Sequence, residues 1–359
     1  MKQLITRRKQ RAGALVTLSV IALLFLQTCK DKGNPIDGQE SQRGKIVFTM
    51  LDTLGVDHFG EPATGSVIFR MNLDGTRLTR LTLRGEILDT FQNRPRIRGS
   101  AMEPRWSQDG KKIVYSESLG PDESHIVMMN EDGSNKKVLT PVGGYCIRPK
   151  WSPKGDRILY LRGTYIGAII ATSIVDTNGN SVDVIDQRDQ GLTYEGDSVF
   201  INPISGKDWA GDNNYLYIVG SVGKRYGEPG YSQAIEIFRL EIITKKLVQR
   251  MTRNSIDESG CEISPTGTQI VFFQGPYQTD RKIYLMSVTD FVATPITTGK
   301  SDQWPRWSND GKLIVYTKDV NDDPYTVEER IYLVNPTEPF KETRVSSLYA
   351  GQPDLFVYH

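Results

Sequence analysis

The chain has 359 residues, with 44 Lys and Arg side chains against 43 Asp and Glu and a formal net charge of +1. This balance excludes the basic surface that holds nucleic-acid phosphates, so we expect no nucleic-acid partner. Three cysteines are too few for a disulfide-stapled fold. The three histidines, His58, His125 and His359, are far apart in the sequence and offer little for a metal site, so none is expected.

Residues 1–28 are predicted to be a lipoprotein signal peptide. Basic side chains up to Arg11 precede an apolar run from Ala12 to Leu26, which has the length of a signal-peptide core and is short for a transmembrane helix. The run ends in Leu26-Gln27-Thr28-Cys29, which resembles the lipobox of bacterial lipoproteins, and this implies lipidation of Cys29. An uncleaved membrane anchor is the alternative. Both interpretations place the rest of the chain outside the cytoplasm.

The segment 29–43 is polar, has no apolar periodicity and is predicted to be a flexible tether. Removing residues 1–28 takes away five basic side chains and no acidic one, so the net charge falls from +1 to −4. The basic bias therefore belongs to the signal and not to a binding surface.

The remaining residues, 44–359, form a repeat. Its first phrase joins Pro, a variable residue, Trp and Ser to a glycine turn and an apolar strand. Strong copies are residues 104–115 (PRWSQDGKKIVY), 149–160 (PKWSPKGDRILY) and 305–316 (PRWSNDGKLIVY). Weaker copies are residues 208–217 and 263–272. Glycine at these turns tolerates a positive φ, which predicts tight hairpins between β-strands.

A second phrase follows the first, as in residues 67–82 (VIFRMNLDGTRLTRLT) and 126–140 (IVMMNEDGSNKKVLT), with shorter copies at 283–286 and 331–335. Each unit thus contains four short strands. The Trp position recurs after 45, 58, 54, 44 and 48 residues. Four-stranded units of roughly 40–50 residues are typical of β-propeller blades.

The two ends of the repeat complete each other. Residues 45–48 read as a second strand without a first, and residues 353–356 read as a first strand without a second. The prediction is an all-β fold, a six-bladed β-propeller of four-stranded blades whose ring is closed by pairing of the N- and C-terminal strands.

These phrases resemble the repeat of the TolB-like β-propellers, and the resemblance covers residues 44–359. The small α/β domain that precedes the propeller in TolB itself has no counterpart here, so the resemblance implies the propeller part alone. The family also includes a metal-dependent lyase of pectate fragments, whose chemistry would call for clustered histidines.

The repeated aromatic and turn residues are expected to be structural. We expect Trp106, Trp151, Trp209 and Trp307 to lie wedged between adjacent blades, and the Ser and Asp-Gly residues that follow to shape the hairpin turns. Cys146 and Cys261 are expected to be buried free thiols, with a disulfide as the less favoured alternative.

Two acidic loops, residues 176–183 and 319–323, have the oxygen ligands that calcium prefers, although solvated turns have the same composition. No cofactor other than calcium is a candidate. Long stretches at 84–102, 187–207 and 220–233 could carry binding on a rigid scaffold or be elongated solvent loops. The last contains Arg225, Tyr226 and Tyr231.

The innermost strands of a propeller line a central channel, and the residues that enter them lie at its mouth. The predicted rim consists of Glu103, Arg148, Glu262, Gln303, Trp304 and Gln352. Trp304 is the one Trp outside the repeated position. It could anchor a partner or plug the channel against water.

We therefore expect a lipid-anchored protein of the bacterial cell envelope, at the outer membrane on its periplasmic or surface face. It would bind or scaffold a protein or peptide partner at the channel mouth and contact the membrane through its anchor only. The alternatives are a polysaccharide-acting lyase or hydrolase and a non-catalytic glycan binder. A pair of carboxylates converging at one mouth would favour the enzyme. Exposed parallel aromatic faces would favour the glycan binder.

Overall fold

The structure, a computed structural model, places most of the repeat region. It describes residues 44–56, 62–83, 85–91, 94–120, 123–140, 144–164, 169–186, 192–201, 208–211, 213–223, 235–253, 258–276, 280–299, 301–321, 328–337, 339–346 and 350–358. Within this part of the chain, no helix is long and apolar enough to span a membrane. The predicted signal peptide, Cys29 and the tether lie outside the described residues.

The described regular structure is all β, and most of it forms sheets whose strands follow one another along the chain. The first two such sheets contain β6 (Ala101–Trp106), β7 (Lys112–Gly120), β8 (Glu123–Asn130), β9 (Lys137–Val138), β10 (Tyr145–Trp151), β11 (Arg157–Gly163), β12 (Ile169–Asp176) and β13 (Ser181–Asp186). Two later ones contain β20 (Glu258–Ile263), β21 (Gln269–Gln274), β22 (Lys282–Ser287), β23 (Ala293–Pro295), β24 (Asp302–Trp307), β25 (Ile314–Asp319), β26 (Glu329–Val334) and β27 (Glu342–Arg344). One parallel bridge, Tyr145 to Ser124, joins the β6–β9 sheet to the β10–β13 sheet. The four-stranded repeat unit predicted from the sequence is confirmed in these sheets.

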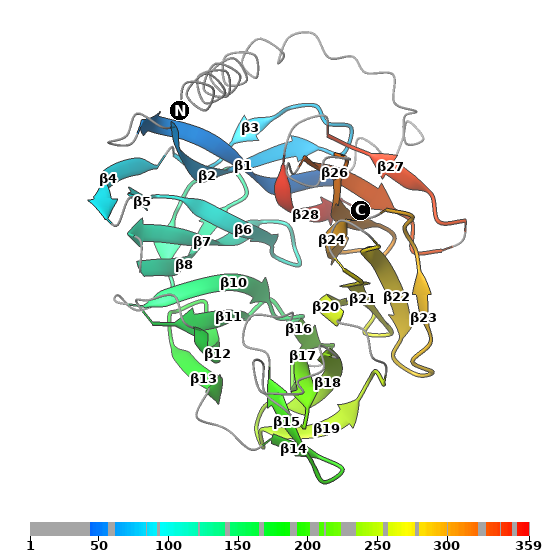
Figure 1. The fold of residues 1–359 in the computed structure, drawn as a ribbon. Helices are drawn as coiled ribbons and strands as arrows, with labels where there is room; N and C mark the ends of the chain where they lie inside the picture. The colour runs from blue at the N-terminus through cyan, green and yellow to red at the C-terminus, as the bar shows by residue number, and fades with distance from the viewer. Residues whose placement is uncertain are drawn as a thin grey trace, which may run out of the picture.

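The ends of the repeat region meet in a single sheet. It has the order β28 (Gly351–Val357), β1 (Gly44–Val56), β2 (Pro62–Asn72) and β3 (Thr79–Arg80), with Ile46 opposite Leu355. Figure 1 shows the first and last strands side by side. The two incomplete ends of the sequence repeat therefore form one four-stranded unit.

Two predicted loops contain strands. Residues 84–102 include a separate hairpin of β4 (Glu86–Phe91) and β5 (Arg94–Arg98). Residues 187–207 include β14 (Leu192–Tyr194) and β15 (Asp197–Ile201), so this stretch is not simply a connection between units. The turn between them has positive φ at both central residues, Glu195 and Gly196. Glu-Gly is an uncommon pair for such a turn, which explains why the hairpin was missed.

The sheet that contains β15 also contains β16 (Asp208–Ala210), β17 (Tyr215–Val222), β18 (Ile235–Glu241) and β19 (Lys246–Arg250). Both β15 and β16 pair with β17, Ile201 opposite Gly220 and Asp208 opposite Tyr217. Two separate described segments, β15 and β16, therefore pair with the same side of β17.

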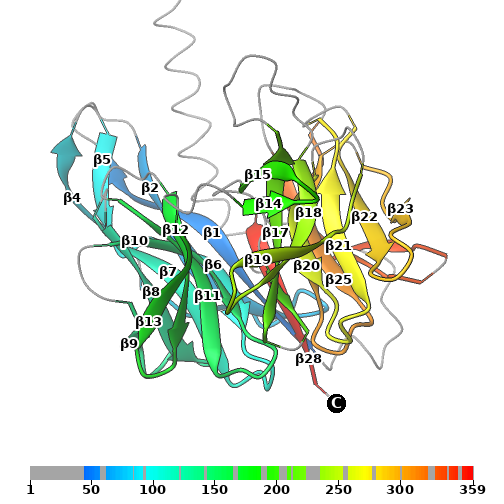
Figure 2. The same cartoon turned by 90° about the horizontal axis from the view of Figure 1, so that it is seen from below.

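The sheets stand around a common centre, with β6, β10, β16, β20, β24 and β28 innermost (Figures 1 and 2). The repeated Trp side chains lie between neighbouring sheets. Trp106 packs with Val47 and Ile68 of the adjacent sheet, and its ring centroid is 6.0 Å from that of Phe356. Trp209 of β16 and Leu159 of β11 belong to one buried cluster, which joins their two sheets. Trp307 is similarly buried, and Trp151 is half-buried.

The turn residues of the first phrase act as predicted. The hydroxyl of Ser107 accepts a hydrogen bond from the backbone N–H of Lys112 at 3.0 Å and donates to Asp109 at 2.7 Å. Ser308 and its neighbours repeat both bonds. Gly110 and Gly311 have φ of 66° and 72°, which the hairpin requires. The prediction that these residues shape the turns is confirmed.

Candidate functional site

Five of the innermost strands share a position with positive φ, three residues before the Trp position. The φ angle is 56° at Glu103, 58° at Arg148, 64° at Gly260, 56° at Trp304 and 51° at Gln352. In β6, β10, β20 and β24 the residue lies in a β-bulge, where the pairing register shifts. A positive φ costs a non-glycine residue about 1 kcal/mol, so the fold holds these side chains in place against local preference.

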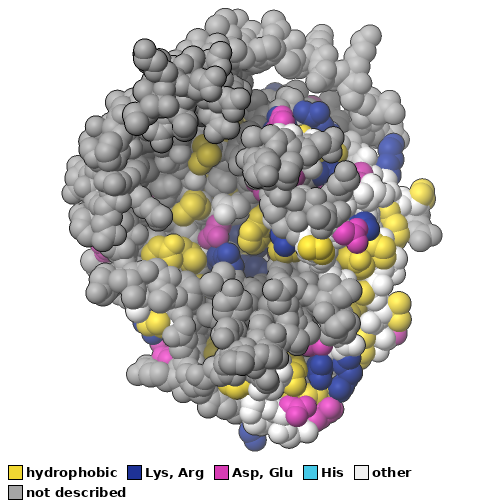
Figure 3. Space-filling model, viewed as in Figure 1, with side chains coloured by type: hydrophobic (Ala, Val, Ile, Leu, Met, Phe, Trp, Pro, Cys, Tyr) yellow, Lys and Arg dark blue, Asp and Glu magenta, His cyan; other side chains and the backbone are white. Residues whose placement is uncertain are grey.

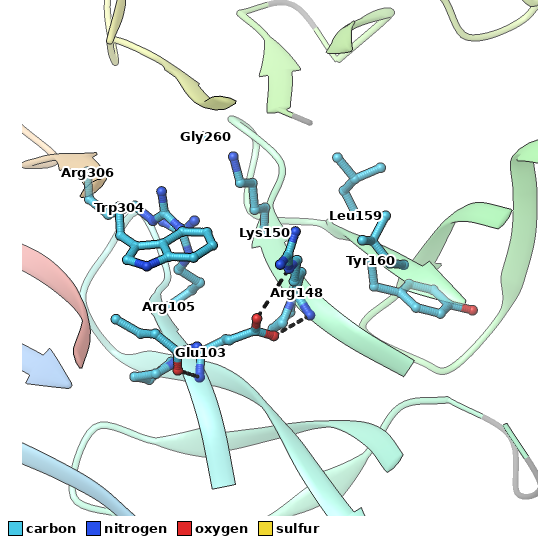
Figure 4. Close-up of a pocket in the computed structure, with 13 residues that line it drawn as sticks. Glu103, Arg105, Arg148, Lys150, Leu159, Tyr160, Gly260, Trp304 and Arg306 are labelled. Carbon is cyan, nitrogen blue, oxygen red and sulfur yellow. Dashed lines mark hydrogen bonds and ion pairs between the residues drawn. The ribbon is translucent and has the colours of Figure 1, made fainter. Parts of the chain in front are cut away.

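The strained residues are linked from sheet to sheet. The side-chain oxygen Oε1 of Gln352 accepts a hydrogen bond from the backbone N–H of Glu103 at 3.0 Å. Glu103 Oε2 in turn accepts from the backbone N–H of Arg148 at 2.6 Å, and Oε1 lies 3.4 Å from Arg148 Nε. Each bond reaches the corresponding residue of the next sheet, so the strained residues fix one another (Figure 4).

Arg148 and Trp304 meet across the centre, although 156 positions separate them. The Arg148 guanidinium lies 5.4 Å from the centroid of the Trp304 ring. The other contact of Trp304 is edge-on with Phe273, at 5.8 Å between centroids and an interplanar angle of 69°. A cation–π contact of this kind contributes about 0.5–1 kcal/mol at a partly exposed site.

A central charge cluster lies one level deeper. Its six members occupy the variable position between Pro and Trp, or the corresponding position in the weaker copies: Asp354, Arg105, Lys150, Asp208, Glu262 and Arg306. Their side chains are at most 13% exposed. Three cations face three anions, so the cluster is neutral when all six are ionised.

Glu262 is the hub of the central charge cluster. Its Oε2 lies 3.0 Å from Arg105 Nη1, 3.3 Å from Arg306 Nε and 3.8 Å from Lys150 Nζ. Burial raises the pKa of Glu262, but the attraction of these three cations outweighs burial, and the net pKa lies below its usual value. Burial also lowers the pKa of Arg306 to about 10, an effect that the nearby Arg105 reinforces.

The acidic members also bond to the backbone of the following sheet. Asp354 accepts from the N–H of Trp106 at 2.6 Å, and Glu262 accepts from the N–H of Trp307 at 3.1 Å. Trp307 donates a second hydrogen bond to the same residue, from its indole N–H to the carbonyl of Glu262 at 3.3 Å. Trp151 and Trp209 donate in the same way to the carbonyls of Arg105 and Lys150. The repeated Trp position thus packs between sheets and bonds to them.

The central charge cluster separates two cavities. The rim pocket, of about 50 Å³, is lined by Glu103, Arg148, Trp304, Gln352, Tyr160 and the cluster cations Arg105, Lys150 and Arg306, with neighbouring residues. A larger cavity of about 120 Å³ lies on the other side, and all three cluster carboxylates line it. Figure 3 shows Lys or Arg side chains at the bottom of a hollow near the middle of the rim face.

The structure brings four of the six predicted rim residues together: Glu103, Arg148, Trp304 and Gln352. The other two predicted rim residues do not line this pocket. Gln303 precedes the strained residue, so its side chain points the other way and bonds to Glu329. Glu262 follows the strained residue by two positions and lies in the charge cluster, while Gly260 takes its place at the rim.

The described residues of the predicted calcium loops, and the two cysteines, lie outside the rim pocket lining. The Asp176 carboxylate accepts hydrogen bonds from the backbone N–H groups of Asn178, Gly179 and Asn180, as in a solvated turn. Cys146 and Cys261 are buried free thiols, as predicted, though each lies within its innermost strand. Residues 322–323, Arg225, Tyr226, Tyr231, His58 and His359 lie outside the described residues.

His125 is buried, with Nδ1 3.3 Å from the carbonyl of Thr140 and Nε2 3.2 Å from Glu123. Among the residues that the structure describes, no three His, Cys, Asp or Glu side chains are grouped to hold a metal ion.

The charge cluster should make stability depend on pH. Burial raises the pKa of Asp354 from 3.8 to about 6, against the attraction of Arg105. Between these values the Asp354 carboxyl binds more protons in the folded state than in the unfolded state, so its own contribution to stability should fall as pH rises from 4 to 6. The contribution is at most about 3 kcal/mol. Asp354→Asn keeps an oxygen for the N–H of Trp106, and its free energy of unfolding should lack this fall.

Urea denaturation of both proteins at several pH values between 4 and 7 measures the effect. Parallel curves for Asp354→Asn and the wild type would contradict the raised pKa.

Comparisons with known proteins support the fold. No protein-family model matches the chain. Dipeptidyl-peptidase 5 from Porphyromonas endodontalis is 23% identical over 258 residues, which make up 62% of this chain but only 36% of that peptidase. The chain therefore spans about a third of this curated relative.

Solved structures match over more of the chain. TolB from Acinetobacter baumannii gives a TM-score of 0.61 at 14% identity, over 88% of this chain and 67% of its own. A protein from Agrobacterium tumefaciens described as a TolB gives 0.57 at 15% identity, over 86% of this chain and 91% of its own. At such identities the likeness shows the fold alone. The chain has the fold of a TolB-like β-propeller.

Proposed function

We propose that this protein is a lipid-anchored binding or scaffolding protein of the bacterial envelope, which recognises a protein or peptide partner at the rim pocket. The observation that carries the proposal is the convergence there of strained residues from several sheets, held by bonds from Gln352 to Glu103 and from Glu103 to Arg148. Strain maintained at one mouth is typical of a functional surface.

The pairing of β28 with β1 supports a closed ring. We infer a propeller of six blades, in which the sheet of β28, β1, β2 and β3 is the blade made from both ends of the repeat region. A closed ring gives the rim pocket a rigid wall on every side.

Anchoring rests on the lipobox-like sequence before Cys29. If Cys29 is lipidated, Cys29→Ser should leave an uncleaved precursor or release the protein from the membrane fraction. Metabolic labelling with a fatty-acid analogue should mark the wild type alone. Equal labelling of the two proteins would sink the assignment, and attachment at the outer membrane would lose its basis.

Partner binding should depend on Arg148 and Trp304. The double variant Trp304→Ala, Arg148→Ala removes the aromatic and cationic centre of the rim, and partner capture from solubilised envelope should weaken by about 2 kcal/mol or more. Arg162→Ala is a matched control, because its side chain is 30% exposed against 29% for Arg148, and it pairs with Asp183 away from the rim. Unchanged capture with a lowered melting temperature would mean that the rim is structural.

The second candidate is an enzyme, which the match to a dipeptidyl-peptidase supports. A polysaccharide lyase or hydrolase would need a pair of carboxylates at one mouth. Among the described lining of the rim pocket, Glu103 is the one carboxylate, and that lining has no Ser, Cys or His. This lining favours binding over catalysis at the rim, and a catalytic pair would have to come from the three carboxylates of the opposite cavity. Hydrolysis of peptide or oligosaccharide libraries, lost in a rim variant, would decide for the enzyme.

A further inference from the structure

The rim pocket and the cavity opposite it differ in charge. The cluster cations Arg105, Lys150 and Arg306 line the rim pocket, where Arg148 adds a fourth cation. The cluster carboxylates Asp208, Glu262 and Asp354 line the cavity on the other side, where Arg105 and Lys150 also reach, and none of the three lines the rim pocket. The described lining of the rim pocket thus presents four cations and a single carboxylate to anything that enters it.

The carboxylates are held on their side by the backbone. Asp208 Oδ2 accepts from the N–H of Ile263 at 2.9 Å, and Asp354 and Glu262 accept from the corresponding N–H groups of Trp106 and Trp307. They cannot turn toward the rim without leaving these buried N–H groups unpaired, which is costly. The separation of charge across the cluster is therefore built into the backbone.

Two of the cluster cations retain hydrogen-bonding capacity. Lys150 has three N–H donors, and the hydrogen bond from its Nζ goes to the carbonyl of Cys261 at 3.2 Å, while the Asp208 and Glu262 carboxylates lie farther away, at 3.7 and 3.8 Å. Arg306 donates from Nη1 to the carbonyl of Pro305 and uses Nε against Glu262. Burial lowers the pKa of both groups, so a further negative charge beside them would be favourable.

The contacts of Trp304 bear on whether the ligand of the rim pocket is a sugar or a peptide. A sugar ring would need an open aromatic face to stack on. The Arg148 guanidinium already lies over the ring of Trp304, whose edge contact goes to Phe273. The remaining walls include Leu159, Leu161 and Tyr160, which suit apolar side chains of a peptide.

We propose that the rim pocket binds the carboxylate of a peptide partner, with Arg148 as the outer contact and the cluster cations beneath it. This inference rests on the proposed function and specifies its ligand chemistry. Because the attraction is between charges, binding should weaken as salt is raised.

The test titrates the full-length chain in detergent with acetyl-Ala-Ala-Phe as the free acid and as the amide, followed by calorimetry. The acid should bind at least tenfold more tightly than the amide. Arg148→Gln should abolish that difference, Arg148→Lys should restore part of it, and Arg162→Gln should leave it unchanged. A thermal melt of each variant shows whether it is folded.

A second pair of arms locates the carboxylate and challenges the ligand class. Acetyl-Ala-Glu-Ala-amide carries the charge on a side chain, and tighter binding of this peptide or of the free acid identifies the source. Equal affinity for acid and amide, or tighter binding of digalacturonic acid than of either peptide, would overturn the proposal. Partner capture that still depends on Trp304 would then leave the proposed function standing without its carboxylate ligand.

Discussion

Glu262→Gln should lower the free energy of unfolding by about 3–5 kcal/mol, the usual cost of removing one partner from a buried ion pair. The change keeps the shape of the side chain and an oxygen for the N–H of Trp307. It leaves Arg105, Lys150 and Arg306 facing two carboxylates instead of three. Since the lowered pKa of Glu262 means that its ionised form is favoured in the fold, the loss should persist at neutral pH. Urea denaturation at pH 7.5 measures it.

The control is Glu195→Gln. Glu195 pairs with Arg253 at 3.0 Å, the same distance that separates Glu262 from Arg105. The side chains of Glu195 and Arg253 are each 58% exposed, however. An exposed pair is screened by water, so this variant should unfold almost like the wild type. If both variants lose the same stability, burial does not decide the strength of the central contacts.

Deleting residues 352–359 should abolish cooperative folding or cause aggregation. The deletion removes most of β28, including the buried side chains of Leu355 and Phe356. These two alone contribute roughly 3–6 kcal/mol, a large part of the about 5–15 kcal/mol that stabilises a typical protein. The hydrogen-bonding edge of β1 would also be left open to other chains. Circular dichroism melts and light scattering measure both effects.

A chain that ends at Tyr358 is the matched control, because it retains all of β28. It should melt like the full chain. If the protein without residues 352–359 also melts like the full chain, the two ends do not support each other and the proposed ring closure fails.

The fold was predictable because its determinants are local and repeated. The Ser and Gly residues that close each first hairpin recur with the same hydrogen bonds, as at Ser107 and Ser308. The strands at 192–201 were missed because their turn, Glu195-Gly196, is an uncommon choice for two positive φ angles. The sequence signal there was the apolar run Val199-Phe200-Ile201 and not the turn.

The candidate site was predictable only in part. Four rim residues lie three positions before the Trp position of their repeat. The weaker copy around Ile263 lacks both Pro and Trp, so its strand position was harder to assign, and Glu262 was predicted at the rim instead of Gly260. The charge cluster was missed although its signal was present, since the residue before the Trp position is charged in every copy. Repetition drew attention to the constant residues, whereas the ion pairs depend on three-dimensional proximity between the variable ones.

The contacts that join neighbouring sheets also bear on how such a chain can evolve by duplication. Trp151, Trp209 and Trp307 make the same indole bond, so a copied unit would fit its neighbours in shape. It would not fit in charge, because a second Lys150 or a second Glu262 at the centre would meet buried charges already balanced. The position between Pro and Trp is therefore where a copied unit would have to change its charge to fit its neighbours, so the units are not interchangeable in their order along the chain.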